Sequence, residues 1–293
     1  MLAPVRLPLI ASLMTALLLA SPAAAKARLR FQPETVKPGD PLLLHITGVK
    51  GLVTGTAGGR ALSFYVARRG GYQALTGLPV EQAPGTLAVK VEVRQTAGDA
   101  PEVFEVQVPV VDSKYPAREL KVAGKFIDPP PGVKAQMKAD RLAFAQAFDQ
   151  PFSDPFFVKD FILPREGVMT APYGDLRTFN GKKASQHYGV DLEGGVGAPI
   201  VASNAGTVVM ARDCYGSGTT VILHHGAGLF TSYFHMSRMD VKPGEKVKAG
   251  QRLGLVGKTG RVTGPHLHWG VKSDGLWVDG QTLLNLRFFE PPA

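Results

Sequence analysis

Three short stretches in the second half of the chain place histidine and aspartate at spacings that suit metal binding. They read His187-Tyr-Gly-Val-Asp191, Ser232-Tyr-Phe-His235 and Gly264-Pro-His266-Leu-His268. Zinc in proteins takes imidazole nitrogens and carboxylate oxygens as ligands. These stretches therefore predict a metal centre in the C-terminal half of the chain.

The spacing within each stretch indicates how the side chains can meet. On a β-strand, residues two positions apart face the same side, so His266 and His268 would lie about 6.5 Å apart on one face, one on a metal and one beside it. His187 and Asp191 also share a face, but a flat strand would hold them about 13 Å apart. Gly189 lies between them and permits a bulge or bend. We expect a local distortion there that lets both side chains converge.

Two histidines and one carboxylate leave a fourth coordination position for water, which separates catalytic zinc from structural zinc. Zinc lowers the pKa of such a water from about 16 toward 7 and polarises a carbonyl group as a Lewis acid. A neutral histidine nearby can take the proton or stabilise developing charge, and His235 and His266 are the natural candidates. A lone His-x-His on a strand often only satisfies a turn or a carbonyl group. Metal binding is favoured because His187 and Asp191 occur in the same chain as the His266-x-His268 pair.

The segments that must position these residues have the pattern of short β-strands. From about Phe161 onward, apolar runs alternate with turns, as in antiparallel sheets. Asn180-Gly181 predicts a hairpin, because this pair suits a tight turn with positive φ. The expected strands cover residues 199–202, 206–210, 219–224, 229–235, 250–256 and 264–271. We expect a C-terminal domain built on an antiparallel β-sheet over residues 161–290.

The N-terminal half is also β-rich. Residues 27–112 alternate between apolar strands and turns, a pattern that suggests an immunoglobulin-like β-sandwich. This stretch has no cysteine pair and no tryptophan, so the narrower antibody pattern does not apply. We expect the sandwich domain to cover residues 26–127.

A linker is expected between the two domains, over residues 128–160. Residues 128–132 read Asp-Pro-Pro-Pro-Gly, which is stiff and extended. Residues 133–148 are good helix formers without Pro or Gly, and they predict a short amphipathic helix with Leu142, Phe144 and Phe148 on its apolar side. The predicted fold class is mainly β: a sandwich, a short linker helix and an antiparallel β domain.

Residues 1–25 have the composition of a secretory signal peptide. Arg6 precedes an apolar run over residues 7–20, and Ala23 and Ala25 form an Ala-x-Ala cleavage site. A membrane anchor is the alternative, because the run approaches the shortest length that spans a bilayer. Pro22 and the alanines favour cleavage, and no later segment is apolar for long enough to cross a membrane. We expect an exported protein, in the periplasm or outside the cell.

The net charge of the chain is +9, and it would be +8 without the signal peptide and its Arg6. A basic surface favours anionic partners. For an exported protein, anionic wall polymers and acidic muropeptides fit better than nucleic acid, which we do not expect as a partner. Cys214 is the single cysteine, so an intrachain disulfide is excluded.

The metal-binding stretches belong to a longer ordered set of motifs within residues 164–286. In chain order they are Tyr173-Gly-Asp-Leu-Arg177, His187-Tyr-Gly-Val-Asp191, Pro199-Ile-Val-Ala, Gly206-Thr-Val, Tyr233-Phe-His235-Met-Ser237, Val241-Lys-Pro-Gly-Glu-Lys-Val and Thr259-Gly-Arg-Val-Thr-Gly-Pro-His266-Leu-His268. This order resembles the M23 peptidases, also called LytM or lysostaphin-type endopeptidases. The resemblance covers a little under half of the expected mature chain.

The resemblance implies a largely antiparallel β fold with a groove over one sheet. It implies one Zn²⁺ per chain on His187, Asp191 and His268, and it implies that His235 and His266 activate water or stabilise the tetrahedral intermediate. The activity implied is hydrolysis of peptide cross-links or bridges of peptidoglycan through a metal-activated water. Partners in wall synthesis or division are not indicated.

Several alternatives remain open at the level of sequence. A non-catalytic LytM-like activator of a cell-wall amidase resembles the same fold, but such activators typically lose metal ligands. Arg177 can bind a substrate carboxylate, or it can pair with an acid and brace the groove. Some M23 peptidases carry an oxyanion-helper tyrosine before the first zinc histidine. Residues 174–186 contain no tyrosine, so Tyr173 or Tyr188 would have to substitute. Direct cross-links and glycine bridges both remain candidate substrates.

Overall fold

The computed structural model describes residues 26–289 except 99, 122–128 and 182, and this part of the chain is mainly β. The predicted fold class of mainly antiparallel β structure is therefore confirmed. The predicted signal peptide lies outside the described residues. In the described part of the chain, no helix is both long enough and apolar enough to span a membrane.

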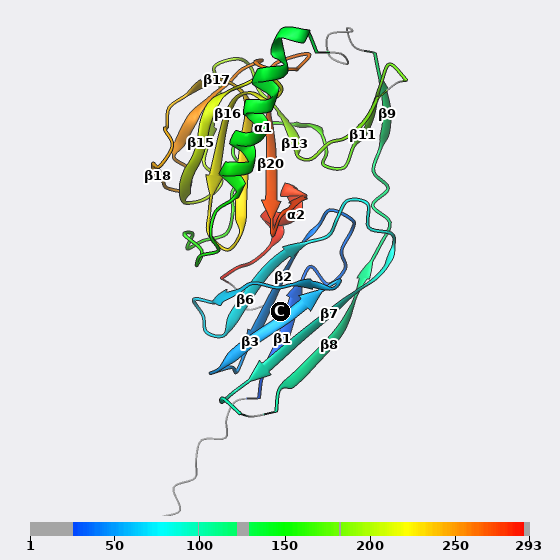
Figure 1. The fold of residues 1–293 in the computed structure, drawn as a ribbon, viewed down its shortest axis with the longest axis vertical. Coiled ribbons are helices and arrows are strands. Elements are labelled where there is room, and N and C mark those ends of the chain that lie inside the picture. The colour runs from blue at the N-terminus through cyan, green and yellow to red at the C-terminus, as the bar shows by residue number, and fades with distance from the viewer. Residues whose placement is uncertain (1–25, 99, 122–128, 182, 290–293) are drawn as a thin grey trace, which may run out of the picture.

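The N-terminal unit consists of two four-stranded antiparallel sheets (Figure 1). One sheet has the order β1 (Arg28–Gln32), β2 (Pro41–Thr47), β6 (Tyr72–Gly77), β5 (Phe64–Val66). The other has the order β4 (Arg60–Ala61), β3 (Leu52–Ala57), β7 (Gly85–Arg94), β8 (Glu102–Val110). Buried side chains of both sheets form one hydrophobic cluster, so the two sheets pack face to face. The immunoglobulin type of this unit stays a prediction.

Strands β7 and β2 of this unit differ in burial: β7 is buried on one face and β2 on both. In β7, Leu87, Val89, Val91 and Val93 are buried while the residues between them are more exposed, as expected for a strand with one face on a core. In β2, six consecutive residues are buried. This strand is covered on both faces, because one face packs inside the sandwich and Leu43 on the other joins the core of the C-terminal unit.

The C-terminal unit is built on an antiparallel sheet that carries the histidines. Its strand order is β10 (Met169–Ala171), β13 (Val190–Glu193), β20 (His266–Ser273), β17 (Leu229–Met239), β16 (Gly218–His224), β15 (Gly206–Cys214), β18 (Lys246–Val247). Three further strands attach at its sides, β14 (Pro199–Val201), β19 (Arg252–Val256) and β21 (Leu276–Val278). In this sheet, β13, β20 and β17 are direct neighbours, so the motifs that are distant in sequence lie side by side.

A small second sheet stands beside the main one. It has the order β12 (Lys183–Gln186), β11 (Leu176–Phe179), β9 (Ala117–Leu120). β11 and β12 form the predicted hairpin, and both Asn180 and Gly181 have positive φ, at 51° and 66°. β9 pairs with β11 in parallel. A strand from the segment that leaves the sandwich therefore becomes part of the C-terminal unit.

The linker helix α1 (Lys134–Phe148), preceded by a 3-10 turn (Pro131–Val133), lies along the main sheet (Figure 1). Ala147, Phe144 and Phe148 pack on its strands. Leu142, expected on the apolar side, is 57% exposed, whereas Asp140 is buried. Asp140 accepts hydrogen bonds from the Arg212 side chain and from the Tyr215 amide at 3.0 and 2.8 Å, so it ties the helix to the sheet.

The two units share a continuous interface. Leu43 and Leu75 of the sandwich belong to the same buried cluster as the C-terminal core. Arg60 forms an ion pair with Asp274 at 2.6 Å. The short helix α2 (Gly280–Asn285) lies between the units in Figure 1, and Thr282 on it donates to Asp40 of the sandwich at 2.7 Å.

One buried histidine makes the stability of the C-terminal unit depend on pH. His225 is fully buried, its Nδ1 donates to the Ala205 carbonyl at 2.7 Å and its Nε2 lies 2.7 Å from the Thr231 hydroxyl. Burial lowers the pKa of His225 to about 4, from 6.5. The neutral ring therefore stabilises the fold above pH 6.5, and this contribution is lost as pH falls from 6.5 toward 4.

We expect the free energy of unfolding to drop by about 3 kcal/mol over this range on account of His225. Denaturant unfolding of the protein and of His225→Gln at several pH values measures the difference in slope. NMR titration of the His225 ring checks the cause directly. A ring that becomes protonated near pH 6.5 in the folded protein would contradict this expectation.

Candidate metal centre and groove

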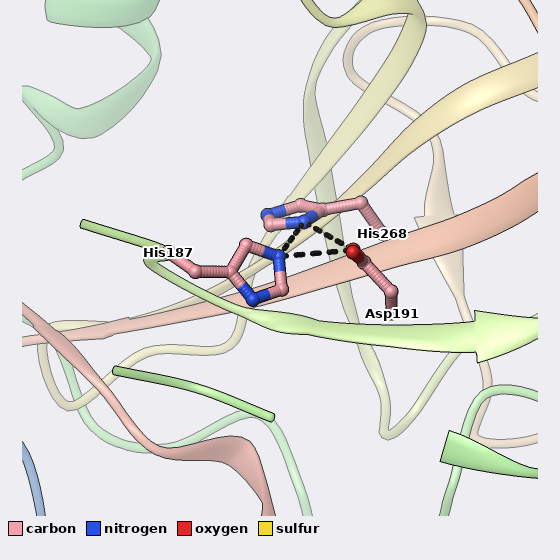
Figure 2. A group of neighbouring side chains, drawn as sticks. All are labelled: His187, Asp191 and His268. Atoms are coloured by element: carbon pink, nitrogen blue, oxygen red, sulfur yellow. Dashed lines mark hydrogen bonds and ion pairs between the residues drawn. The ribbon is translucent and has the colours of Figure 1, made fainter. Parts of the chain in front are cut away.

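The three predicted metal ligands converge at one point (Figure 2). His187 Nε2 lies 3.0 Å from Asp191 Oδ1 and 3.0 Å from His268 Nδ1, and His268 Nδ1 lies 2.9 Å from Asp191 Oδ1. The side chains of His187 and Asp191 are buried and that of His268 is half-buried. Each residue thus presents one donor atom to a shared centre.

Strand register brings these atoms together. Asp191 in β13 pairs directly with His268 in β20, so their side chains rise from adjacent strands. His187 lies after β12 and before β13, where the chain leaves regular strand geometry. The break over residues 187–189 removes the 13 Å separation that a flat strand would impose. The expected distortion at Gly189 is therefore present.

The donor set fits a divalent cation such as zinc. The Nδ1 of His187 donates to the Pro172 carbonyl at 2.7 Å, which leaves a lone pair on Nε2 in the neutral ring. Nε2 and the Asp191 carboxylate then face each other as two acceptors, and a cation between them relieves this conflict. Two ligands on a tetrahedral zinc lie about 3.3 Å apart at normal bond lengths. The three donors need to move only slightly to reach that spacing.

Gly189 is required for close packing beneath one ligand. A Cβ atom at this position would lie 2.6 Å from His268 Nε2 and 2.7 Å from the Trp269 carbonyl oxygen. The glycine therefore allows the chain to pass directly under the imidazole. The bend at this glycine is predictable from the sequence, but its steric reason is visible only in the folded arrangement.

We expect Gly189→Ala to displace the His268 ring. The protein should bind clearly less than one zinc per chain, and the overpacked site should lose about 1–3 kcal/mol of stability. Gly195→Ala is the matched control, because a Cβ there meets nothing within 4 Å. Metal analysis by mass spectrometry and thermal unfolding measure both effects. Full zinc occupancy in Gly189→Ala would show that the close approach does not matter.

A chain of ion pairs supports the aspartate. The second oxygen of Asp191 accepts from Arg177 at 3.1 Å, and Arg177 also donates to Asp175 at 3.1 Å. Arg118 on β9 lies 3.2 Å from the other oxygen of Asp175. Burial alone would raise the pKa of Asp191, but its contacts with the imidazoles of His187 and His268 hold it well below its usual range. The linker strand β9 is therefore connected to the metal centre through charged side chains.

These contacts favour the bracing role for Arg177 over substrate binding. The role of Arg177 stays a prediction. We expect Arg177→Lys to weaken zinc binding by about 10–100-fold, because lysine keeps the charge but not the fork that holds two carboxylates. The KM should change little. Competition with a chelating dye measures zinc affinity. A raised KM with unchanged zinc affinity would instead support the substrate-binding role.

His235 owes its position to a β-bulge. Tyr233 pairs with Val221 and Met236 with Thr219, so Phe234 and His235 together face the single residue Thr220. The bulge gives His235 a φ of 63°, which is unfavourable for a residue with a Cβ and recurs at functional sites. Because of the bulge, His235 lies beside the metal centre, with its ring centroid 6.1 Å from that of His268.

His266 stands next to His235, their ring centroids 4.9 Å apart. The Nδ1 of His266 donates to the Gly264 carbonyl and that of His235 to the Thr259 carbonyl, each at 3.0 Å. The Nε2 of His266 lies 3.7 Å from Asp191 Oδ1. Burial and the neighbouring imidazoles lower the pKa of His235 to about 3. All five predicted site residues thus meet in one place, and their individual roles remain predictions.

Phe234 is a site residue that the sequence reasoning missed. Its neighbours Tyr233 and Trp269 are fully buried. Phe234 instead stacks on the His268 ring, at 5.2 Å between centroids and 11° between planes. Phe144 of α1 contacts Phe234 edge-on. Phe234 pairs with His268 in regular register, so strand alternation puts it on the groove side, and the bulge then adds His235 on that side.

Tyr173 and Tyr188 are the two candidate oxyanion helpers. Neither of them both precedes His187 in the sequence and lines the groove. Tyr173 is buried, and its hydroxyl donates to the Trp277 carbonyl at 2.9 Å. Tyr188 is 37% exposed and lines a cavity together with His187 and His268. Of the two, only Tyr188 borders the metal centre.

The metal centre lies in a groove made of two adjoining cavities of about 550 and 340 Å³. Both are bordered by the β11–β12 hairpin and by His235 and His268. The larger cavity is also lined by Arg118, by His266 and by the loop over residues 261–265. The smaller one is lined by aromatic residues, which are Phe179, Tyr188, Phe234 and Trp277. Charged side chains of both signs therefore line the larger cavity, whereas aromatic side chains gather in the smaller one.

Comparison with known proteins agrees with this site. Residues 185–280 match peptidase family M23. The chain is 47% identical over 88 residues to the peptidoglycan DD-endopeptidase ShyA of Vibrio cholerae, a match that covers 30% of this chain and 20% of ShyA. It is 33% identical to the catalytic domain of the antimicrobial peptidase lysostaphin from Staphylococcus simulans, over 41% of this chain and 93% of that domain, with a TM-score of 0.37.

A solved structure also matches most of the chain. It is a putative M23 peptidase from Pseudomonas aeruginosa, with a TM-score of 0.61 and 23% identity over 86% of this chain and 95% of that one. At this identity the likeness concerns the fold, including the presence of an N-terminal unit. The C-terminal unit therefore carries a domain of peptidase family M23 over residues 185–280. The match spans only about a fifth of the length of ShyA.

Proposed function

We propose that the protein is a zinc-dependent endopeptidase that hydrolyses peptide bonds in bacterial peptidoglycan. The observation that carries the proposal is the convergence of His187 Nε2, Asp191 Oδ1 and His268 Nδ1 within 3.0 Å of one another, beside His235 and His266 in an open groove. Similarity to a peptidoglycan DD-endopeptidase supports the substrate class.

His187, Asp191 and His268 would hold the metal. A divalent cation bound there supplies Lewis acidity, which polarises a peptide carbonyl and makes water more acidic. Arg177 holds the second carboxylate oxygen of Asp191, so that Oδ1 stays directed at the two imidazoles. Phe234 stacks on His268 and fixes the plane of its ring. These contacts pre-organise the donors before substrate arrives.

His235 and His266 are placed to move protons. Each donates from Nδ1 to a backbone carbonyl, so in the neutral ring Nε2 is free to accept a proton. Both residues line the larger cavity. We assign them the transfer of a proton from the attacking water toward the leaving amine, together with stabilisation of the charge that develops on the carbonyl oxygen.

The compartment follows from the substrate. A wall hydrolase acts outside the cytoplasm, which agrees with the signal peptide expected over residues 1–25. The protein would thus be exported and would meet peptidoglycan peptides in the periplasm or outside the cell. The assembled set of five side chains supports catalysis over the alternative of a non-catalytic amidase activator.

Digestion of purified peptidoglycan tests the proposal. The zinc-loaded protein should release muropeptides with newly formed ends, identified by mass spectrometry. A chelator should abolish the release, and added zinc should restore it. Digestion that continues after complete metal removal would overturn the mechanism. Stimulation of an added amidase without any cleavage by the protein itself would support the activator alternative.

A further inference from the structure

The loop over residues 257–265 holds one arginine at a fixed place on the groove. Thr259 Oγ1 accepts from the Thr219 amide at 2.9 Å and donates to the Met236 carbonyl at 2.7 Å. The Arg261 amide donates to the Gly216 carbonyl at 2.9 Å. Gly260 has a φ of 77° and packs against Gly218, where a Cβ would lie 2.4 Å from the Gly218 nitrogen. The backbone that carries Arg261 is therefore anchored on the sheet.

The guanidinium group of Arg261 differs from the other arginines of the groove. Arg118 and Arg177 both pair with Asp175. Arg261 has no ion pair within the described part of the chain, and its Nε is buried without a hydrogen-bond partner. The remaining acids of the larger cavity are Asp191, which Arg177 and the histidines engage, and the exposed Glu193, which forms no ion pair with Arg261. A buried donor without a partner is costly.

A carboxylate is the ligand that best matches a guanidinium group without an ion pair, because its two oxygens fit the guanidinium fork. Arg261 lines the same cavity as His235 and His266, so a peptide bound across the metal centre can reach it. The smaller cavity is lined mostly by aromatic residues, and the arginine that lines it, Arg177, is already paired with Asp175 and Asp191. The arginine without an ion pair therefore lies on the side of the groove that holds His266.

We infer that Arg261 binds a free carboxylate on the substrate and selects acidic cross-links, such as those through diaminopimelate, over glycine bridges. This inference rests on the proposed function and names its substrate class. Diaminopimelate keeps a carboxylate beside the cross-link, whereas a glycine bridge has no side-chain charge. The site therefore contributes to KM and leaves the chemical step largely unchanged.

The test compares two cross-linked peptide dimers, one with the free diaminopimelate carboxylate and one with that group amidated. Arg261→Gln, Arg261→Lys and the control Arg252→Gln, which removes an exposed charge outside both cavities, are compared with the unsubstituted protein. Titration calorimetry with the metal-free proteins measures binding without turnover. Steady-state kinetics with the zinc-loaded proteins gives kcat and KM.

Arg261→Gln should weaken binding and raise the KM of the free-carboxylate dimer by about tenfold or more, with kcat within about twofold. It should change the binding and the KM of the amidated dimer little. Arg261→Lys should restore part of the affinity for the free-carboxylate dimer. Equal losses on both dimers, or a loss in kcat alone, would show that Arg261 only holds the loop. The inference would also be overturned if the unsubstituted protein had a higher kcat/KM on a pentaglycine peptide than on the free-carboxylate dimer. Binding that depends on Arg261 without any turnover would leave the carboxylate site standing and overturn the proposed function.

Discussion

Replacing Asp191 with asparagine is expected to remove the metal and to lower peptidoglycan hydrolysis at least about a thousandfold. The carboxylate supplies the only negative charge among the three donors, and its Oδ1 lies within 3.0 Å of both imidazole nitrogens. A neutral amide binds a divalent cation much less well. The Lewis acid contributes several kcal/mol to the transition state, and each 1.36 kcal/mol is a factor of ten in rate.

The matched control is Asp213→Asn, an aspartate on the same sheet whose carboxylate accepts from Thr219 and lines neither cavity of the groove. Zinc content and digestion rate are measured on both variants. The control should keep one zinc per chain and full activity. An Asp191→Asn protein that retains both zinc and activity would rule out this carboxylate as a ligand.

Replacing His235 with alanine is expected to lower kcat by about 10²–10⁴-fold, the usual contribution of a general acid or base. His235 lies at the bulge beside the metal centre, but it is not one of the three converging donors. Zinc should therefore remain bound at one per chain, and KM should change by no more than a few-fold. This separation of kcat from metal content distinguishes proton transfer from metal binding.

His45→Gln serves as the control for the histidine substitution, since His45 lies in the sandwich and its Nε2 contacts the Gly70 carbonyl at 3.0 Å. It should leave kcat unchanged. A second variant, His266→Ala, shows how the pair divides the work, because His266 lies next to His235 and within 3.7 Å of Asp191. Full activity in both His235→Ala and His266→Ala would remove the proton-transfer role.

The sequence was sufficient to predict which side chains would meet. Two of the patterns are local, namely His266-x-His268 on a strand and His187-x3-Asp191 around a glycine. Strand periodicity predicts which face of the sheet each residue occupies. The mainly β fold and the Asn180-Gly181 hairpin followed from equally local signals. Such features are predictable because their physical cause lies within a few residues.

Other parts of the site depend on contacts between distant segments. The parallel pairing of β9 with β11 brings Arg118 to Asp175, and nothing near Arg118 in the sequence indicates this. The bulge that places His235 beside Phe234 on the groove arises from the register between β16 and β17. Asp140 is buried on α1 because Arg212 and Tyr215 meet it there. In each case tertiary pairing, and not local propensity, decides the position.

The proposed function requires one divalent cation held by His187, Asp191 and His268. Anomalous X-ray diffraction at the zinc absorption edge, on crystals of the purified zinc-loaded protein, locates this cation. We expect a single strong peak bonded to His187 Nε2, Asp191 Oδ1 and His268 Nδ1. A peak bonded to other residues, or no peak at this position in active protein, would contradict it.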